Sequence, residues 1–299
     1  MGLVYGPDGR HPWAKHSALQ PTPCLMDDDL LRIFVGFRDD SGVGRIGFVD
    51  VNPDNPGEVL RVSEKPVLDI GLPGTFDDNG VIPCAIVRRG SELFLYYAGY
   101  QLGSKVRFLA FGGLARSCDG ETFVRSSNVP VLDRTSGEFL FRAIHSMFYE
   151  DGVWKTWYGA GNEYLQTEEK ALPKYNVRYI ESKDGITFAG EGRVCIDTQG
   201  ADEYRIGRPW VIRHDGIYKM FYSIGTRSKI FRLGYAESRD GIHWVRMDDR
   251  MGLDVSSSGW DSQMICYPSV LENKGRVYLF YNGNSYGRSG FGYAILREW

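Results

Sequence analysis

Acidic, basic and imidazole side chains recur at one position of a repeated pattern in this chain. Four prolines, Pro21, Pro83, Pro209 and Pro268, each lie 13 or 14 residues before the end of an aromatic run, and side chains suited to chemistry lie around or just ahead of this position. They are His16, Asp77, Asp78, Arg142, His145, Glu203, Arg205, Arg208 and Asp261. Carboxyl groups at a common site can exchange protons with a substrate, and guanidinium groups can bind phosphate through paired hydrogen bonds.

The aromatic runs themselves form a repeat that predicts the fold. Their last residues are Val35, Tyr97, Tyr158, Tyr222 and Tyr281, so the steps are 62 (35 to 97), 61 (97 to 158), 64 (158 to 222) and 59 (222 to 281). A fixed period carried by strand-like segments is typical of closed repeat arrays. We expect an all-β fold, a five-bladed β-propeller, in which residues 1–299 form a single domain. A strand near residues 3–5 is expected to close the ring against residues 292–296.

A second repeat, Ser-x-Asp-Gly-x-x-aromatic, is in register with the first. It occurs at Ser117–Phe123, Ser182–Phe188 and Ser238–Trp244. Asp-Gly favours a tight turn because glycine adopts a positive φ without steric cost. The repeated aspartates are therefore predicted to be structural and not catalytic.

A propeller brings the starts of its inner strands to one channel mouth. The polar residues named above are expected to meet there, because buried unpaired charges are costly unless a wet or ligand-binding channel surrounds them. A second interpretation is a network of ion pairs that plugs the channel, with Asp78–Arg142 and Glu203–Arg208 as conceivable pairs.

Aromatic side chains near the predicted mouth are candidates for stacking on sugar rings. Trp260 and Tyr267 are the first choices, and most other aromatic residues are expected to fill the interfaces between blades. The insertion at residues 163–175 is either a rim loop over the mouth or an ordinary exposed excursion.

The segment Phe76-Asp77-Asp78-Asn79-Gly80-Val81, the Asp-Gly turns and the repeated aromatic strand ends resemble the five-bladed glycosidase superfamily. That superfamily comprises glycoside hydrolase families 43, 32 and 68, with family 130 phosphorylases as relatives. The resemblance implies a carboxylate on the first blade as base or nucleophile and a glutamate on a later blade as acid. Glu203 matches the later position, but residues 16–21 hold no carboxylate.

The resulting prediction is a carbohydrate-active enzyme that cleaves a glycosidic bond by acid/base catalysis. Asp78 is assigned as the base and Glu203 as the acid, with Asp261 at the same mouth; glycoside hydrolysis normally uses two such carboxyl groups. Arg205 and Arg208 would favour the charged form of Glu203, which opposes a role as acid. Two alternatives stay open. One is phosphorolysis or sugar transfer at an Arg/His phosphate site, and the other is a non-catalytic sugar-binding propeller.

Bulk properties limit the partners that we expect. The chain has 35 Lys and Arg against 38 Asp and Glu, a net charge of −3, which does not favour nucleic-acid binding. It contains no apolar run of membrane-spanning length and does not begin like a signal peptide, so we predict a cytoplasmic protein without membrane contact. Five scattered cysteines predict free thiols and no structural metal. We expect a sugar, an oligosaccharide or a sugar phosphate as substrate, and no cofactor.

Overall fold

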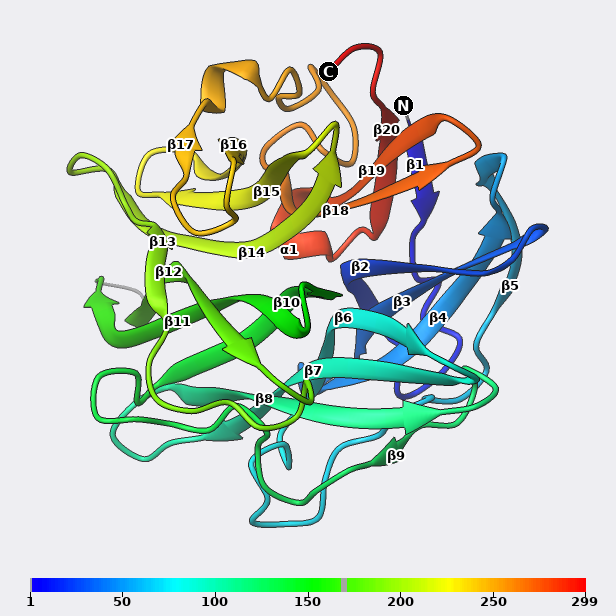
Figure 1. The fold of residues 1–299 in the computed structure, drawn as a ribbon. Helices are drawn as coiled ribbons and strands as arrows, with labels where there is room; N and C mark the ends of the chain where they lie inside the picture. The colour runs from blue at the N-terminus through cyan, green and yellow to red at the C-terminus, as the bar shows by residue number, and fades with distance from the viewer. Residues whose placement is uncertain (1, 168–170) are drawn as a thin grey trace.

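The computed structural model describes residues 2–167 and 171–299, which form five groups of four antiparallel strands around a central axis (Figure 1). Blade one contains β2 (His16–Asp27), β3 (Leu30–Arg38), β4 (Gly44–Asn52) and β5 (Asn55–Val62). Blade two contains β6 (Val81–Arg89), β7 (Glu92–Leu102), β8 (Phe108–Ser117) and β9 (Val124–Arg125). Blade three contains β10 (Phe141–Glu150), β11 (Val153–Gln166), β12 (Ala171–Ser182) and β13 (Arg193–Ile196).

The last two blades differ in how they are completed. Blade four contains β14 (Glu203–His214), β15 (Ile217–Thr226), β16 (Ile230–Ser238) and β17 (Val245–Arg246), followed by the short 3₁₀ helix η1 (Asp248–Arg250). Blade five contains β18 (Cys266–Asn273), β19 (Arg276–Asn282) and β20 (Phe291–Ile295), with the four-residue helix α1 (Asn284–Gly287) between β19 and β20. Its fourth strand is β1 (Gly2–Tyr5), from the other end of the chain.

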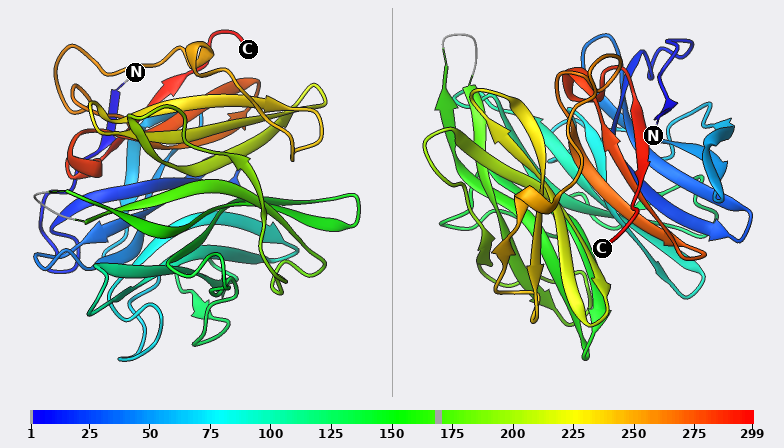
Figure 2. Two further views of the ribbon diagram at one scale, coloured as in Figure 1. Left: turned by 90° about the vertical axis from the view of Figure 1, so that its left-hand side faces the viewer. Right: turned by 90° about the horizontal axis from the view of Figure 1, so that it is seen from above.

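The ring closes as the repeat predicts. β1 pairs antiparallel with β20, with Leu3 opposite Gly292, so the first and last strands of the chain share one sheet. In Figure 1 the blue start of the chain lies beside the red end. The inner strands β2, β6, β10, β14 and β18 surround the centre of this view, and Figure 2 shows the blades as a stack of twisted sheets from the side.

Apolar side chains fill the interfaces between neighbouring blades. Five large buried clusters occur, one for each interface of the ring. Phe34 of blade one packs with Leu95 of blade two, for example, and Phe280 of blade five packs with Ile33 of blade one. The aromatic runs therefore lie in the second strand of each blade, where both faces of the strand are buried.

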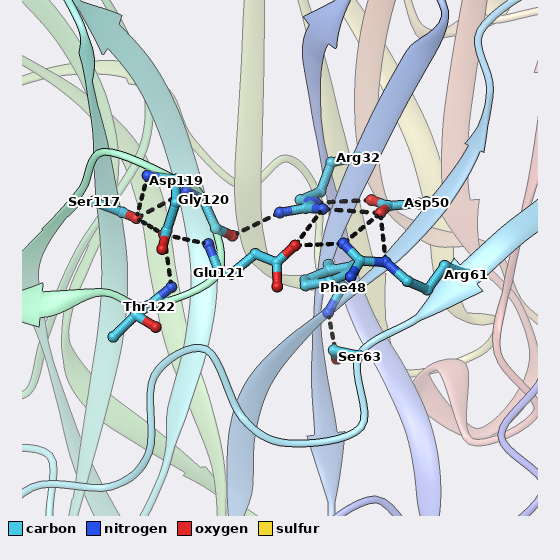
Figure 3. A network of polar contacts seen from close by, with 10 residues as sticks. All are labelled: Arg32, Phe48, Asp50, Arg61, Ser63, Ser117, Asp119, Gly120, Glu121 and Thr122. Atoms are coloured by element: carbon cyan, nitrogen blue, oxygen red, sulfur yellow. Dashed lines mark hydrogen bonds and ion pairs between the residues drawn. The ribbon is translucent and has the colours of Figure 1, made fainter.

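The Asp-Gly turns are structural, as predicted. In the turn of blade two, Asp119 Oδ1 accepts the backbone N–H of Glu121 at 2.8 Å and of Thr122 at 3.0 Å, and Gly120 has φ +70°. The carbonyl of Gly120 then accepts a hydrogen bond from Arg32 Nη1 of blade one (Figure 3). The corresponding carbonyls of Gly185 and Gly241 accept hydrogen bonds from Tyr96 and Trp157 of the preceding blades. Each of these turns thus holds two blades together.

Four blades also tie the tyrosine at the end of the aromatic run to a carboxylate. The pairs are Tyr97–Asp77, Tyr158–Glu138, Tyr222–Asp248 and Tyr281–Asp261. In three of them an arginine completes the contact, because Arg125 bonds Asp77, Arg142 pairs with Glu138 and Arg246 bonds Asp248. Blade one has Val35 at this position and therefore no such contact.

Two further features bear on the bulk predictions. In the part of the chain that the structure describes, no helix is long and apolar enough to span a bilayer. The thiols of Cys24, Cys84, Cys118, Cys195 and Cys266 are free.

Candidate functional site: the cavity at the channel mouth

A cavity of about 500 Å³ opens at the end of the channel where the inner strands begin. Every blade contributes to its wall. Its polar side chains are Gln20, Arg38, Ser41, Asn79, Tyr100, Arg107, His145, Tyr175, Arg205, Arg208, Tyr267 and Tyr286. Apolar groups such as Phe108 and Phe141 complete the wall, and a concave site with aromatic walls and convergent polar groups is typical of small-molecule binding.

A β-bulge in each inner strand directs side chains toward the channel centre. The register shifts lie between Leu19 and Thr22, Pro83 and Ala85, Ile144 and Ser146, Gly207 and Trp210, and Cys266 and Ser269. A bulge leaves residues unpaired in the ladder and re-aims their side chains. The bulges contain Gln20, Cys84, His145, Arg208 and Tyr267, one per blade.

Three of these bulge residues have a strained backbone. Gln20 has φ +54°, Arg208 φ +54° and Tyr267 φ +58°, although none of them is glycine. Residues with side chains rarely adopt this region, and such strain is frequent at functional sites. A proline follows each of these three residues, so the bulges of blades one, four and five share one sequence pattern.

Arg208 links blade four to blades one and two at the cavity. Its Nη2 donates to Pro21 O at 3.1 Å and to Thr22 Oγ1 at 2.8 Å, and its Nη1 donates to Cys84 O. The side chain is 2% exposed, and burial lowers the pKa of Arg208 to about 10. The guanidinium therefore remains charged at neutral pH while carbonyl and hydroxyl oxygens, not carboxylates, surround it.

His145 is a neutral hydrogen-bond donor in this setting. Burial, together with the adjacent Arg208, holds the pKa of His145 well below its usual range. Because a guanidinium only donates, His145 Nδ1 accepts from Arg208 Nη1, 3.5 Å away, and the ring proton is on Nε2. This arrangement leaves Nε2–H as the donor that His145 can offer to another group.

Arg205 lies on the cavity wall above Phe231. Its guanidinium carbon is 4.2 Å from the centre of the Phe231 ring and 4.8 Å from that of Tyr204. The side chain is 5% exposed, and neither Nε nor Nη2 has a hydrogen-bond partner. Tyr175 is its one polar side-chain contact among the described residues, so this buried cation retains unused donor capacity at Nε and Nη2.

The described lining of the cavity contains no Asp or Glu. The three carboxylates predicted to be catalytic lie in other contacts. Asp78 Oδ2 accepts the backbone N–H of Gly74 at 2.8 Å, and Asp261 accepts the hydroxyl of Tyr281. Glu203 is held by Arg246 through two bonds of 2.8 and 2.9 Å. The structure therefore does not bring Asp78, Glu203 and Asp261 together on the wall of this cavity.

The other predicted site residues divide into two groups. His145, Arg205, Arg208 and Tyr267 line the cavity together. Asp77, Arg142, His16 and Trp260 are not part of the described lining. Asp77 and Arg142 belong to the tyrosine–carboxylate contacts of blades two and three, His16 Nδ1 lies 2.8 Å from Ser17 Oγ, and Trp260 stacks on Tyr281.

The sequence patterns did not single out five polar lining residues, one of which, Ser41, lies in the turn between β3 and β4. Arg38 and Tyr100 lie at the ends of the second strands β3 and β7, Arg107 precedes β8, and Tyr286 lies in α1. The comparison of the blades at their prolines covers only positions at the start of the inner strands, so it does not reach residues on the second and third strands. The position a few residues beyond each aromatic run would have pointed to Arg38 and Tyr100.

The insertion at residues 163–175, for which a rim loop and an exposed excursion were both considered, is described only in part, because residues 168–170 lie outside the described residues. Its flanks extend β11 and β12, with Tyr164 opposite Pro173. Leu172, Pro173 and Tyr175 line the cavity. The described part of the insertion therefore contributes directly to the site.

Comparison with known proteins agrees with this architecture, although no family model matches the chain. A solved structure described as a glycoside hydrolase has a TM-score of 0.74 and 19% identity, covering 100% of this chain and 91% of that chain. A thermostable family-43 glycoside hydrolase has a TM-score of 0.69 and 15% identity, covering 97% and 92%. The fold is that of the glycoside hydrolase β-propellers.

A relative at higher identity places the chain more narrowly. The protein named "Uncharacterized protein Rv1502" from Mycobacterium tuberculosis is 34% identical over 298 residues, which cover 100% of this chain and 98% of the relative. The chain belongs to the family of that mycobacterial protein.

Proposed function

We propose that this protein is a carbohydrate-binding propeller of the glycoside hydrolase type, with its sugar site in the cavity at the channel mouth. Tyrosine rings on the wall offer faces for a sugar ring, and the side chains of Gln20, Asn79 and His145 offer hydrogen bonds to its hydroxyl groups. In this proposal the protein binds its sugar without cleaving it by a pair of carboxylates.

One observation carries the proposal. The described wall of the cavity is rich in donors and has no carboxylate. Hydrolysis of a glycosidic bond normally requires two carboxyl groups on opposite sides of that bond, about 5 to 9.5 Å apart. The predicted roles of Asp78 as base and Glu203 as acid would require both carboxyl groups at the cavity. Neither residue is on its described wall, and Glu203 forms an ion pair with Arg246.

Sugar transfer to phosphate is the second candidate. The arginines on the wall favour it, because guanidinium groups suit an incoming phosphate nucleophile. This candidate predicts that sugar release depends on added phosphate.

A cytoplasmic location also stays a prediction.

Substitution of Glu203 distinguishes sugar binding from hydrolysis by a carboxylate pair. Glu203→Gln is expected to lower the free energy of unfolding by about 1–3 kcal/mol, because it loses a charge-assisted pair with Arg246. Sugar affinity, measured by calorimetry over a panel of monosaccharides and oligosaccharides, is expected to stay within about twofold of wild type. Glu272→Gln, an exposed glutamate on β18, is the matched control.

The same proteins are assayed on aryl glycosides with and without phosphate. We expect no release of the aryl group above the rate without protein. Release in water that Glu203→Gln slows by about 10²–10⁴-fold would instead establish carboxylate hydrolysis. Release only with phosphate would establish the transfer reaction.

A further inference from the structure

We propose that Arg205 holds an acidic group of the sugar ligand, a carboxylate or a phosphoryl group, inside the cavity. The inference rests on the proposed sugar site and specifies the class of sugar: one that carries a negative charge. Four features of the structure support it.

The charge of Arg205 is uncompensated in the described part of the chain. The side chain is 95% buried, since only 5% is exposed, and no ion pair is formed with it among the described residues. Nε and Nη2 are buried without hydrogen-bond partners. Buried polar groups are normally paired, so two free donors on one buried cation indicate a missing acceptor.

The surroundings of Arg205 hold the guanidinium in one place. Phe231, Tyr204 and Tyr286 present ring faces at 4.2, 4.8 and 5.8 Å from its central carbon. Beneath the side chain lies Gly225 of β15, where an added Cβ would come within 2.5 Å of Arg205 Cγ and 2.7 Å of Nε. Only glycine leaves room for the arginine to lie flat on the sheet, so the site is preorganised.

Other cations on the same wall lack acidic partners. Arg208 Nε and Arg38 Nε are also buried without hydrogen bonds, and both residues line the cavity with Arg205. An oxyanion near Arg205 would therefore meet a positive environment on several sides. Guanidinium forks bind carboxylate and phosphate through two parallel hydrogen bonds.

The position of Arg205 gives the ligand an orientation. Arg208 is fixed to Pro21, Thr22 and Cys84, so its own terminal donors are already used. Arg205 is therefore the better partner for a charged group of the ligand. The acidic group of the ligand reaches Arg205 on β14, and the sugar ring remains against the tyrosines of the wall.

Calorimetry with four probes at equal ionic strength tests the inference: glucose, glucuronate, glucose 6-phosphate and inorganic phosphate. We expect the wild-type protein to bind at least one charged sugar about 10-fold or more tightly than glucose. Arg205→Met, of similar length, should weaken that binding by about 10- to 100-fold, since charged hydrogen bonds contribute about 1.5–3 kcal/mol. Arg239→Met, which removes an exposed arginine of blade four, is the control for the change in net charge.

Two further variants separate recognition from a structural role. Without ligand, Arg205→Met should unfold at the same temperature as the wild type or higher, because relief of a buried charge without an acidic partner offsets the loss of its ring contacts. Gly225→Ala displaces Arg205 while retaining it, and should also lower the preference for the charged sugar. A marked loss of stability in Arg205→Met with unchanged charged-sugar affinity would show that Arg205 is structural.

The four probes also separate this inference from the proposed function. Equal affinity for glucose and both charged sugars, unaffected by Arg205→Met, overturns the inference and keeps the sugar site. Arg205-dependent binding of inorganic phosphate, with no gain from the sugar ring, supports the anion site and contradicts the sugar site. Failure of all four probes to bind at millimolar concentration contradicts both.

Discussion

Replacement of Glu138 by Gln is expected to lower the free energy of unfolding by about 3–5 kcal/mol, because it leaves a buried cluster of cations without its anion. Glu138 is 0% exposed. Arg142 Nε lies 2.6 Å and Arg178 Nη1 2.8 Å from its carboxylate, and the hydroxyl of Tyr158 donates to it at 2.8 Å. The substitution keeps the shape of the side chain and removes the charge that both arginines require.

Urea unfolding followed by tryptophan fluorescence measures this effect. Glu64→Gln, at an exposed position, is the control and is expected to change stability by less than about 0.5 kcal/mol. A loss below about 1 kcal/mol for Glu138→Gln would contradict a structural role for this contact. Sugar binding by the folded variant should persist, because Arg142 and Glu138 are not part of the described cavity wall.

The second large effect is expected at the interface between blades one and two. Arg32 and Asp50 are each 2% exposed and form two bonds of 2.7 and 2.8 Å (Figure 3). Arg32 also lies 3.7 Å from the centre of the Phe48 ring and donates to Gly120 O of blade two. Asp50→Asn is therefore expected to cost about 3–5 kcal/mol, since Arg32 would remain buried with only the more distant Glu121, 3.5 Å away, as an acidic partner.

A double variant distinguishes the loss of the ion pair from the cost of leaving one charge buried without its partner. Arg32→Met combined with Asp50→Leu removes both charges, and buried pairs replaced by apolar residues of similar volume often retain stability. We expect the double variant to be more stable than Asp50→Asn. A double variant that loses as much as or more than the single one would mean that the Arg32–Asp50 pair is itself stabilising and that its loss is not offset by apolar burial.

The repeats predicted the architecture because they mark residues that occupy equivalent structural positions in successive blades. The aromatic runs mark the second strands, where burial on both faces requires apolar side chains, and the Asp-Gly turns mark the turns after the third strands, which contact the preceding blade. Closure of the ring by residues 2–5 follows from the same periodicity, and β1 pairs with β20 as predicted. These features repeat, so a single sequence shows them several times.

The site was less predictable because equivalent sequence positions do not present their side chains to the same place. Asp261 lies just ahead of an inner strand, yet its carboxylate bonds Tyr281. Glu203 begins β14 and pairs with Arg246 of β17, whereas Arg205, two residues later, lines the cavity. Strand alternation and β-bulges decide which residues face the channel. The spacing of charges along the chain does not show the tyrosine hydroxyl groups that hold Asp77, Glu138 and Asp261.

A crystal structure of the protein soaked with glucuronate is the most direct test of the sugar site. The account predicts the sugar ring in the cavity at the channel mouth, with its carboxylate accepting hydrogen bonds from Arg205 Nε and Nη2. Glucuronate bound elsewhere, with its ring between Asp78, Glu203 or Asp261 and the cavity left empty at saturating concentration, would contradict it.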